Sequence, residues 1–294
     1  MNYDFKNAKE LLAICKKHEL SISEVMLRRE VDLGEESRKS ILERIDECLR
    51  VMDASSNRYL DEETVTSMGG LIGGESRKLH NLERDKAICG STLHKAIMSA
   101  LSVAETNASM GVIVAAPTAG SAGVVPAAIL SVYEDCDIEL DTLRMGLINA
   151  GAIGYLCTMN GSVAGAEAGC QAEVGSASAM AASALTEMLG GTPEQCCHAA
   201  SIAASNLLGL VCDPVRGLVE VPCQTRNTIG VANAFTAAEL ALAGIKSLVP
   251  LDEMITIMTD VGHTLPESLR ETGKGGCACA PSLCPALSGL GERM

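Results

Sequence analysis

Charge is almost absent from one long stretch of the sequence, and this constrains the fold more than any other feature. Only ten of the 60 charged residues lie between Cys157 and Pro250. The apolar residues of this stretch recur every three or four positions, which is typical of helices. Helices with so little charge must be buried nearly all round. We therefore expect this stretch to form the centre of the protein.

The apolar residues of the chain are also small. Hydrophobic residues make up 47% of the 294 positions, but aromatic residues only 2%, with no Trp. Ala, Val, Ile, Leu, Met and Cys must fill the interior, and small side chains let helices pack closely. The only short strand candidates are 112–115 and 218–221. The sequence predicts an all-α fold, with a single large domain of buried small-residue helices and Gly- and Pro-rich active-site loops.

Helical spacing predicts six longer helices in this domain. They are expected at 91–110, 141–159, 173–189, 192–208, 226–243 and 252–262. Asp141 is expected to cap the second of them. Thr192, followed by Pro193 and Gln195, resembles a capping box with proline at the first helical position.

The first 63 residues differ from the rest in charge. They hold 26 of the 60 charged residues, and positions 5–52 have the spacing of short amphipathic helices. This region is either a solvated helical cap over the core or a subunit-docking arm. The predicted organisation is a charged helical leader at 1–63, part of or packed on the main domain, then the main helical domain at 64–276 and a flexible Cys-containing tail at 277–294.

Net charge and the N-terminus exclude several classes of protein. The formal charge of −14 argues against nucleic acid as a partner, because nucleic-acid binding depends on clustered cationic side chains. The N-terminal segment MNYDFKNAKE lacks the apolar core of a signal peptide. The most apolar stretch, 112–130, is broken by Pro and Gly, so no membrane span is expected. We expect a soluble, cytoplasmic protein.

Thirteen cysteines are the next unusual feature. Disulfides are rare in the cytoplasm, so these cysteines are expected to be packing residues plus a set of metal or redox ligands. Cys170, Cys212 and Cys223 stand in Gly- and Pro-punctuated loops, which can hold sulfur in a fixed direction. The spacings of 42 and 11 residues match no compact CxxC motif. An iron–sulfur or zinc site, free buried cysteines and redox-active thiols all remain open at this point.

The remaining cysteines form two groups. Three lie in the tail, where they are either incidental thiols on a solvated segment or the source of a fourth ligand that substrate displaces: Cys277, Cys279 and Cys284. Seven lie on apolar helix faces and are predicted to pack in the core: Cys15, Cys48, Cys89, Cys136, Cys157, Cys196 and Cys197.

A small-residue loop within AAPTAGSAGVVPAA is the next candidate site. Its backbone N–H groups and two hydroxyls are suited to bind a carboxylate at a helix start, although a plain turn fits equally well. The loop residues concerned are Thr118, Gly120, Ser121 and Gly123.

Arg226 lies in a nearly uncharged neighbourhood and needs an anionic partner. The candidates are Glu220, Asp213 or a substrate carboxylate. None of the five histidines has a clear carboxylate or nucleophile partner in the sequence, so no general base is assigned among them.

Six segments, in order and without a large gap over 64–276, resemble the α chain of iron–sulfur-dependent L-serine dehydratase. They are TVTSMGGLIGGE, TNASMGVIVAAPTAGSAGVVPA, GCQAEVGSASAMAA, GGTPEQCCHAA, NLLGLVCDPVRGLVEVPCQTRN and LRETGKGG. The resemblance implies a helical catalytic domain with a 4Fe–4S cluster bound by Cys170, Cys212 and Cys223. It also implies L-serine as substrate and an oligomeric enzyme of amino-acid degradation and gluconeogenesis.

The same resemblance implies a partner. Members of the family contain a β part, fused or separate, that carries a Ser- and His-containing motif near the active site. Nothing similar occurs in these 294 residues, so a separate β subunit is expected. The base that removes the α-proton is left unassigned, with the partner as one location for it.

The implied reaction is a dehydration without pyridoxal phosphate, in which the cluster acts as a Lewis acid and the products are pyruvate and ammonia. The loop at 118–123, Arg226 and Asn227 are the hypothetical substrate contacts. Two other functions are weighed against this one. A pyridoxal-phosphate lyase needs a Schiff-base Lys beside a glycine loop, for which Lys274 is the one candidate. A cluster-bearing subunit for electron transfer or structure would have no chemistry of its own.

Overall fold

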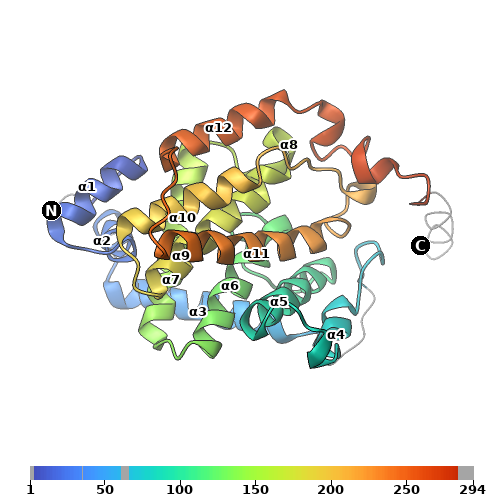
Figure 1. The fold of residues 1–294 in the computed structure, drawn as a ribbon, viewed down its shortest axis with the longest axis horizontal. Coiled ribbons are helices and arrows are strands. Elements are labelled where there is room, and N and C mark those ends of the chain that lie inside the picture. Colours follow the sequence, from blue (N-terminus) through green and yellow to red (C-terminus); the bar gives the residue numbers. More distant parts are fainter. Residues whose placement is uncertain (1–2, 35, 61–65, 284–294) are drawn as a thin grey trace.

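A computed structural model describes residues 3–34, 36–60 and 66–283 of the chain (Figure 1). In these residues there are helices and turns but no β-strand, and one isolated bridge joins Cys212 to Arg270. The predicted all-α fold is confirmed. The α-helices are α1 (Ala8–His18), α2 (Ile22–Gly34), α3 (Arg38–Asn57), α4 (Glu75–His80), α5 (Ser91–Ala108), α6 (Val124–Asp135), α7 (Leu140–Asn160), α8 (Gly165–Ala168), α9 (Ser176–Met188), α10 (Pro193–Asn206), α11 (Cys223–Leu242) and α12 (Leu251–Thr264).

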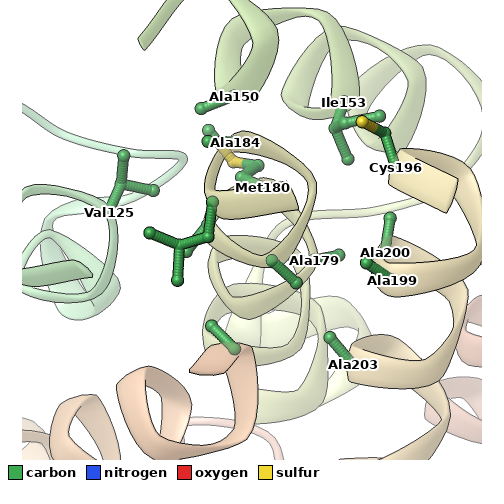
Figure 2. Close-up of a cluster of buried hydrophobic side chains, with 14 of the residues drawn as sticks. Val125, Ala150, Ile153, Ala179, Met180, Ala184, Cys196, Ala199, Ala200 and Ala203 are labelled. Atoms are coloured by element: carbon green, nitrogen blue, oxygen red, sulfur yellow. The ribbon is translucent and has the colours of Figure 1, made fainter. Parts of the chain in front are cut away.

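Helix α9 is the centre of the fold. It packs against α7, α10, α11 and α6, and Glu187 is its one residue that is not fully buried. The charge-poor stretch therefore occupies the position predicted for it. Figure 2 shows the small side chains that fill the space between these helices, including Ala150 of α7, Ala184 of α9 and Ala200 of α10. Such side chains allow the helix backbones to approach closely.

Buried polar groups of the core pair with one another across helices. Ser183 of α9 donates to Asn149 Oδ1 of α7 at 2.6 Å, and Asn149 Nδ2 donates to Glu187 Oε2 at 2.7 Å. The backbone N–H of Ser23 in α2 donates to the same carboxylate oxygen at 3.3 Å. This chain of hydrogen bonds joins three helices and satisfies groups that would be costly to bury unpaired.

The N-terminal helices pack on this core with their apolar faces. Phe5, Leu11 and Cys15 belong to the same hydrophobic cluster as α9 and α10. Asp252, at the start of α12, accepts hydrogen bonds from the backbone N–H groups of Ala8 at 2.6 Å and Lys9 at 3.0 Å. A carboxylate there satisfies donors at the start of α1 that have no partner within that helix.

The helices expected from the sequence all occur, with small differences at their ends. The capping box at Thr192 and Gln195 is present. Asp141 does not cap α7, because the helix begins at Leu140 and Asp141 lies in its first turn, so that prediction was wrong. The helix expected from residue 173 begins as a π-helical turn, Gln171–Gly175, that leads into α9. No described helix combines the length and apolarity needed to cross a membrane.

The cysteines predicted to pack in the core divide into two groups. Four of the seven are buried, namely Cys15, Cys157, Cys196 and Cys197, whereas Cys48 is half-buried. Cys89 and Cys136 are exposed, so the prediction was wrong for them. Cys89 precedes α5 and Cys136 follows α6, and residues at helix ends leave the buried face that their sequence neighbours occupy.

Candidate active site

Three buried cysteines from separate segments lie near one another at one end of α9. Cys170, between α8 and α9, is 2% exposed; Cys212, after α10, is 3% exposed; and Cys223, the first residue of α11, is 8% exposed. Their thiols influence one another electrostatically, since the Cys212 thiol is affected by both of the others and the Cys170 thiol by Cys223. The fold thus brings together the three cysteines singled out in the sequence.

The chain around Cys170 is held on both sides. Gly169 has φ +77°, and its Cα lies so close to the Leu210 carbonyl that a Cβ would come within 2.9 Å of that oxygen. Glycine is the residue that accepts this conformation without strain. On the other side the buried Gln171 amide donates to Met258 O at 2.7 Å and accepts from the backbone N–H of Gly209 at 2.7 Å. These contacts fix Cys170 relative to α12 and to the loop that carries Cys212.

Cys212 is held by its backbone. Its N–H donates to Leu269 O at 2.8 Å, and its carbonyl accepts from the N–H of Glu271 at 2.7 Å. This is the pairing of a single β-bridge, with a segment more than fifty residues later in the chain. A backbone fixed on both sides limits the directions in which the Cys212 side chain can point.

The loop that leads into Cys223 contacts the glycine-rich segment 64–74, of which residues 66–74 are described. The Glu220 carboxylate is fully buried and accepts hydrogen bonds from the Thr66 hydroxyl and, at 3.4 Å, from the N–H of Leu71. A Cβ on Gly69 would collide with the same carboxylate. The described part of the glycine-rich segment therefore packs directly over the loop that leads into Cys223.

All three thiols have raised pKa values. Burial raises the pKa of Cys170 and of Cys223 to about 12, with the nearby Glu173 charge adding to the shift and Arg226 opposing it. Burial also raises the pKa of Cys212. Thiolates are the metal-binding form of cysteine, so these thiols need an added positive charge to ionise in their buried environment.

The possible metal ligands of this site are three cysteine thiols. Within residues 3–34, 36–60 and 66–283, no three His, Cys, Asp or Glu side chains converge closely enough to hold one metal ion. A single zinc ion would need every thiolate at about 2.3 Å from one point. In an iron–sulfur cluster the thiolates bind different iron atoms, so they stay further apart. Cysteine thiolates are the usual ligands of such a cluster, so the chemistry of this donor set fits it.

The small-residue loop lies beside these cysteines. The Asn227 side chain, which is 2% exposed, joins the two. Its Nδ2 donates to the carbonyls of Gly120 and Cys223, both at 2.8 Å, and its Oδ1 accepts from the N–H of Gly123 at 3.0 Å. The Ser121 side chain is fully buried. Asn227 therefore holds the loop against the start of α11, so the predicted loop and the predicted cysteine belong to one site.

Glu173 is a residue of this site that the sequence analysis missed. It lies in the π-helical turn after Cys170, and its carboxylate accepts a hydrogen bond from Thr118 Oγ1 at 2.8 Å. Its other oxygen lies 3.9 Å from Cys212 Sγ. Burial raises the pKa of this carboxyl, and the hydrogen bond from Thr118 opposes that shift. One signal was present, because Glu173 is one of only ten charged residues between 157 and 250.

Arg226 forms an ion pair with one of the candidate partners. Its Nη2 lies 2.6 Å from Asp213 Oδ1, and its Nη1 donates to Val211 O at 2.6 Å. The guanidinium also interacts with the Cys170 sulfur. Arg226 thus links the loop of Cys212 to Cys170.

Two peptide bonds in the loops of this site are cis. One precedes Pro117, just before the small-residue loop, and the other precedes Pro222, just before Cys223.

The beginning of the cysteine tail contacts the same site. Gly276–Cys279 forms a short 3₁₀ turn, and the N–H of Cys277 donates to Asp213 Oδ2 at 2.6 Å. The side chains of Cys277 and Cys279 are exposed. Cys284 lies outside the described residues.

Known proteins are similar to this chain in sequence over most of its length. A family model described as serine dehydratase alpha chain matches residues 17–278. The chain belongs to the serine dehydratase alpha chain family. The resemblance noted from the sequence motifs is thereby confirmed.

Two relatives in this family have nearly the length of the chain. A probable L-serine dehydratase alpha chain from Bacillus subtilis is 48% identical over 95% of this chain and 92% of its own length. The L-serine dehydratase alpha chain of Peptoniphilus asaccharolyticus is 46% identical over 92% of this chain and 93% of its own. L-serine dehydratase 1 of Escherichia coli is 39% identical over 94% of this chain but only 62% of its own length, so that enzyme has a further region in the same polypeptide.

Proposed function

We propose that this chain is the catalytic α subunit of an L-serine dehydratase, which converts L-serine into pyruvate and ammonia. The observation that carries the proposal is the site itself, in a chain of this family. Three buried thiols meet a small-residue loop and a carboxylate that lies beside both. A separate β subunit is proposed as partner, by analogy with the relatives named as alpha chains. Cytoplasmic action in amino-acid degradation, with gluconeogenesis as its metabolic context, and an oligomeric enzyme remain part of the proposal.

We further propose that a 4Fe–4S cluster is held by Cys170, Cys212 and Cys223. When bound, such a cluster with one iron free of protein ligands would supply a Lewis acid that makes a hydroxyl a better leaving group. The three cysteines support this role by their burial and by their positions on three separately fixed segments. Arg226 supports it as well, because a cation beside the Cys170 sulfur favours the thiolate.

The loop at 118–123 is proposed to bind the substrate carboxylate. Its backbone N–H groups precede α6, where the helix dipole favours negative charge. Thr118, Gly120, Ser121 and Gly123 remain the proposed contacts in this loop, although the N–H of Gly123 already donates to Asn227 Oδ1. Arg226 and Asn227 remain proposed substrate contacts as well, and they also hold the loops of the site in place, through Asp213 and Cys223 respectively. The base that removes the α-proton is proposed to lie on the β subunit.

Anaerobic reconstitution of the chain tests the cluster. We expect iron, sulfide and a cluster absorption band in the wild-type chain, and loss of all three when Cys170, Cys212 or Cys223 is replaced by Ala. Cys136→Ala is the matched control, because this exposed cysteine lies at the end of α6. A cluster that persists in all three ligand variants would overturn the assignment.

Pyruvate release from L-serine tests the activity. The reconstituted chain is assayed with and without its β subunit, and turnover is expected only with a loaded cluster. A loaded cluster without any serine turnover in the complete complex would instead favour a cluster-bearing subunit for electron transfer or structure. Turnover that depends on pyridoxal phosphate would overturn both readings.

A further inference from the structure

The Glu173 carboxylate is mostly buried, yet within the described part of the chain it forms no ion pair. Its contacts are the Thr118 hydroxyl at 2.8 Å and, at 3.9 Å, the Cys212 sulfur. Neither contact is a cation. Buried carboxylates are rare unless a positive group accompanies them, because burial removes the water that stabilises the charge. The nearby cation, Arg226, is already paired with Asp213.

Two glycines make room for this carboxylate. A Cβ on Gly165 would come within 2.6 Å of Glu173 Oε2, and a Cβ on Gly120 would come within 3.1 Å of Glu173 Oε1. Both glycines lie in segments of the site, since Gly165 begins α8 ahead of Cys170 and Gly120 is in the small-residue loop. The carboxylate therefore lies close to both segments, in a place that a side chain at either glycine would block. The charges of Glu271 and Arg226 also act on it, in opposite directions.

An amino-acid substrate carries the missing positive charge. L-serine has three groups to be recognised, which are its hydroxyl, its carboxylate and its α-ammonium. The proposed partner of the hydroxyl is the cluster, and that of the carboxylate is the loop at 118–123. The ammonium group has no proposed partner yet. A carboxylate accepts hydrogen bonds at both oxygens, so Glu173 is able to keep its bond from Thr118 and accept others from an ammonium group.

We propose that Glu173 binds the α-ammonium group of the substrate and so selects amino acids over hydroxy acids of the same shape. This inference rests on the proposed function, because it assumes an amino-acid substrate in this site. A simple structural role for Glu173 would be to hold Thr118 and its loop. That role makes a different prediction, since a displaced loop weakens every ligand that has a carboxylate, whether or not it has an ammonium group.

Three ligands of the holoenzyme separate these roles. L-serine has all three groups, L-alanine lacks the hydroxyl, and 3-hydroxypropanoate lacks the ammonium. The complete enzyme, with cluster and β subunit, is compared with Glu173→Gln and Glu173→Asp. KM is measured for L-serine and Kd by calorimetry for the other two, while iron content and the cluster spectrum show that loading is unchanged. Glu167→Gln is the matched control, an exposed carboxylate six residues away that also accepts a bond from a hydroxyl, that of Ser162.

We expect Glu173→Gln to raise KM for L-serine and Kd for L-alanine by about tenfold or more, and to change Kd for 3-hydroxypropanoate by less than about threefold. Glu173→Asp keeps the charge, and its ratio of L-alanine to 3-hydroxypropanoate affinity should stay nearer to that of the wild type. If all three ligands weaken equally, or none does, the inference is wrong. If Glu173→Gln cannot be loaded with its cluster, Glu173→Asp decides alone. An unchanged ratio of L-alanine to 3-hydroxypropanoate affinity in that variant supports the inference, and loss of the preference for L-alanine overturns it. A wild-type complex that does not turn over L-serine would instead refute the proposed function.

Discussion

The Asp213 carboxylate accepts a hydrogen bond from the backbone N–H of Cys277 at 2.6 Å, across 64 residues of sequence. The same carboxylate pairs with Arg226 through its other oxygen. Asp213 directly follows the predicted ligand Cys212, and it is 2% exposed. One buried side chain therefore joins the loop of one cysteine, the helix that begins with another and the start of the cysteine tail.

Replacing Asp213 should destabilise the protein. Asp213→Ala leaves Arg226 without its ion-pair partner and Cys277 without its acceptor, and we expect the free energy of unfolding to fall by about 2–4 kcal/mol. Urea unfolding of the cluster-free chain measures this. Glu43→Ala, which removes an exposed pair with Lys39 at 3.7 Å, should cost less than about 0.5 kcal/mol. Equal losses in the two variants would show that the Asp213 pair is no stronger than a surface pair.

Two glycines in helices should respond in opposite ways to Ala. A Cβ on Gly262 of α12 would collide with Ala168, two residues before Cys170, so Gly262→Ala should destabilise the chain by about 1–3 kcal/mol. A Cβ on Gly151 of α7 meets no atom within 4 Å, so Gly151→Ala should stabilise it by about 0.5–1 kcal/mol through helix propensity. Thermal or urea unfolding checks both signs. Stabilisation by Gly262→Ala would mean that α12 and α8 are less closely packed than described.

Stability should depend on pH through Glu187. Burial raises the pKa of this carboxyl above its ordinary 4.5, although hydrogen bonds from Ser23 and Asn149 oppose the shift. A raised pKa means that the folded state holds the proton more tightly, so this contribution to stability is complete below pH 4.5 and is lost as pH rises through the folded pKa. Glu187→Gln should abolish that loss.

Urea unfolding of wild type and variant from pH 4 to 7 measures the Glu187 effect. The stability of Glu187→Gln relative to wild type should increase as pH rises. The exposed Glu239→Gln controls for the change of one formal charge. A relative stability that falls with pH would show that the hydrogen bonds outweigh burial at Glu187.

Thiol reagents should distinguish exposed from buried cysteines in the native, cluster-free chain. Cys89 and Cys136 are exposed and should be alkylated quickly, whereas Cys157 and Cys196, which are 1% and 0% exposed, should react only after unfolding. Burial also raises the pKa of Cys157 to about 11, which lowers its thiolate fraction further. Mass spectrometry of peptides after timed alkylation gives the order. Modification of Cys196 as fast as Cys89 would contradict the packing of α10 against α9.

The general architecture was predictable because it depends on local patterns. A stretch nearly free of charge and with apolar residues at helical spacing had to form buried helices, and α9 with its neighbours does so. The capping box was equally predictable, since its two partners, Thr192 and Gln195, are three residues apart. Helix ends were less predictable, as Asp141 and the exposed Cys89 and Cys136 show, because small shifts at an end decide what a side chain contacts.

The predicted site residues come from loops that the sequence marks with Gly, Pro and Cys, and the structure brings Cys170, Cys212 and Cys223 together. The contacts that organise them could not be predicted in the same way. Glu173 meets Thr118 from 55 residues away, and Asn227 meets Gly120 from 107 residues away. Such pairs leave no periodic signal in the sequence, because only the packing of α6, α9 and α11 determines which loops become neighbours.

The β-bridge of Cys212 has a consequence for synthesis of the protein on the ribosome. The backbone of this cysteine is fixed by Leu269 and Glu271, so its geometry is incomplete until those residues have left the ribosomal tunnel. Cys170 and Cys223 are translated before Leu269 and Glu271, but the arrangement of three thiols is incomplete until Cys212 is fixed as well. The arrangement of the three thiols should therefore be completed late, after nearly the whole chain has been made, and a nascent chain stopped before residue 269 would present its thiols without that arrangement.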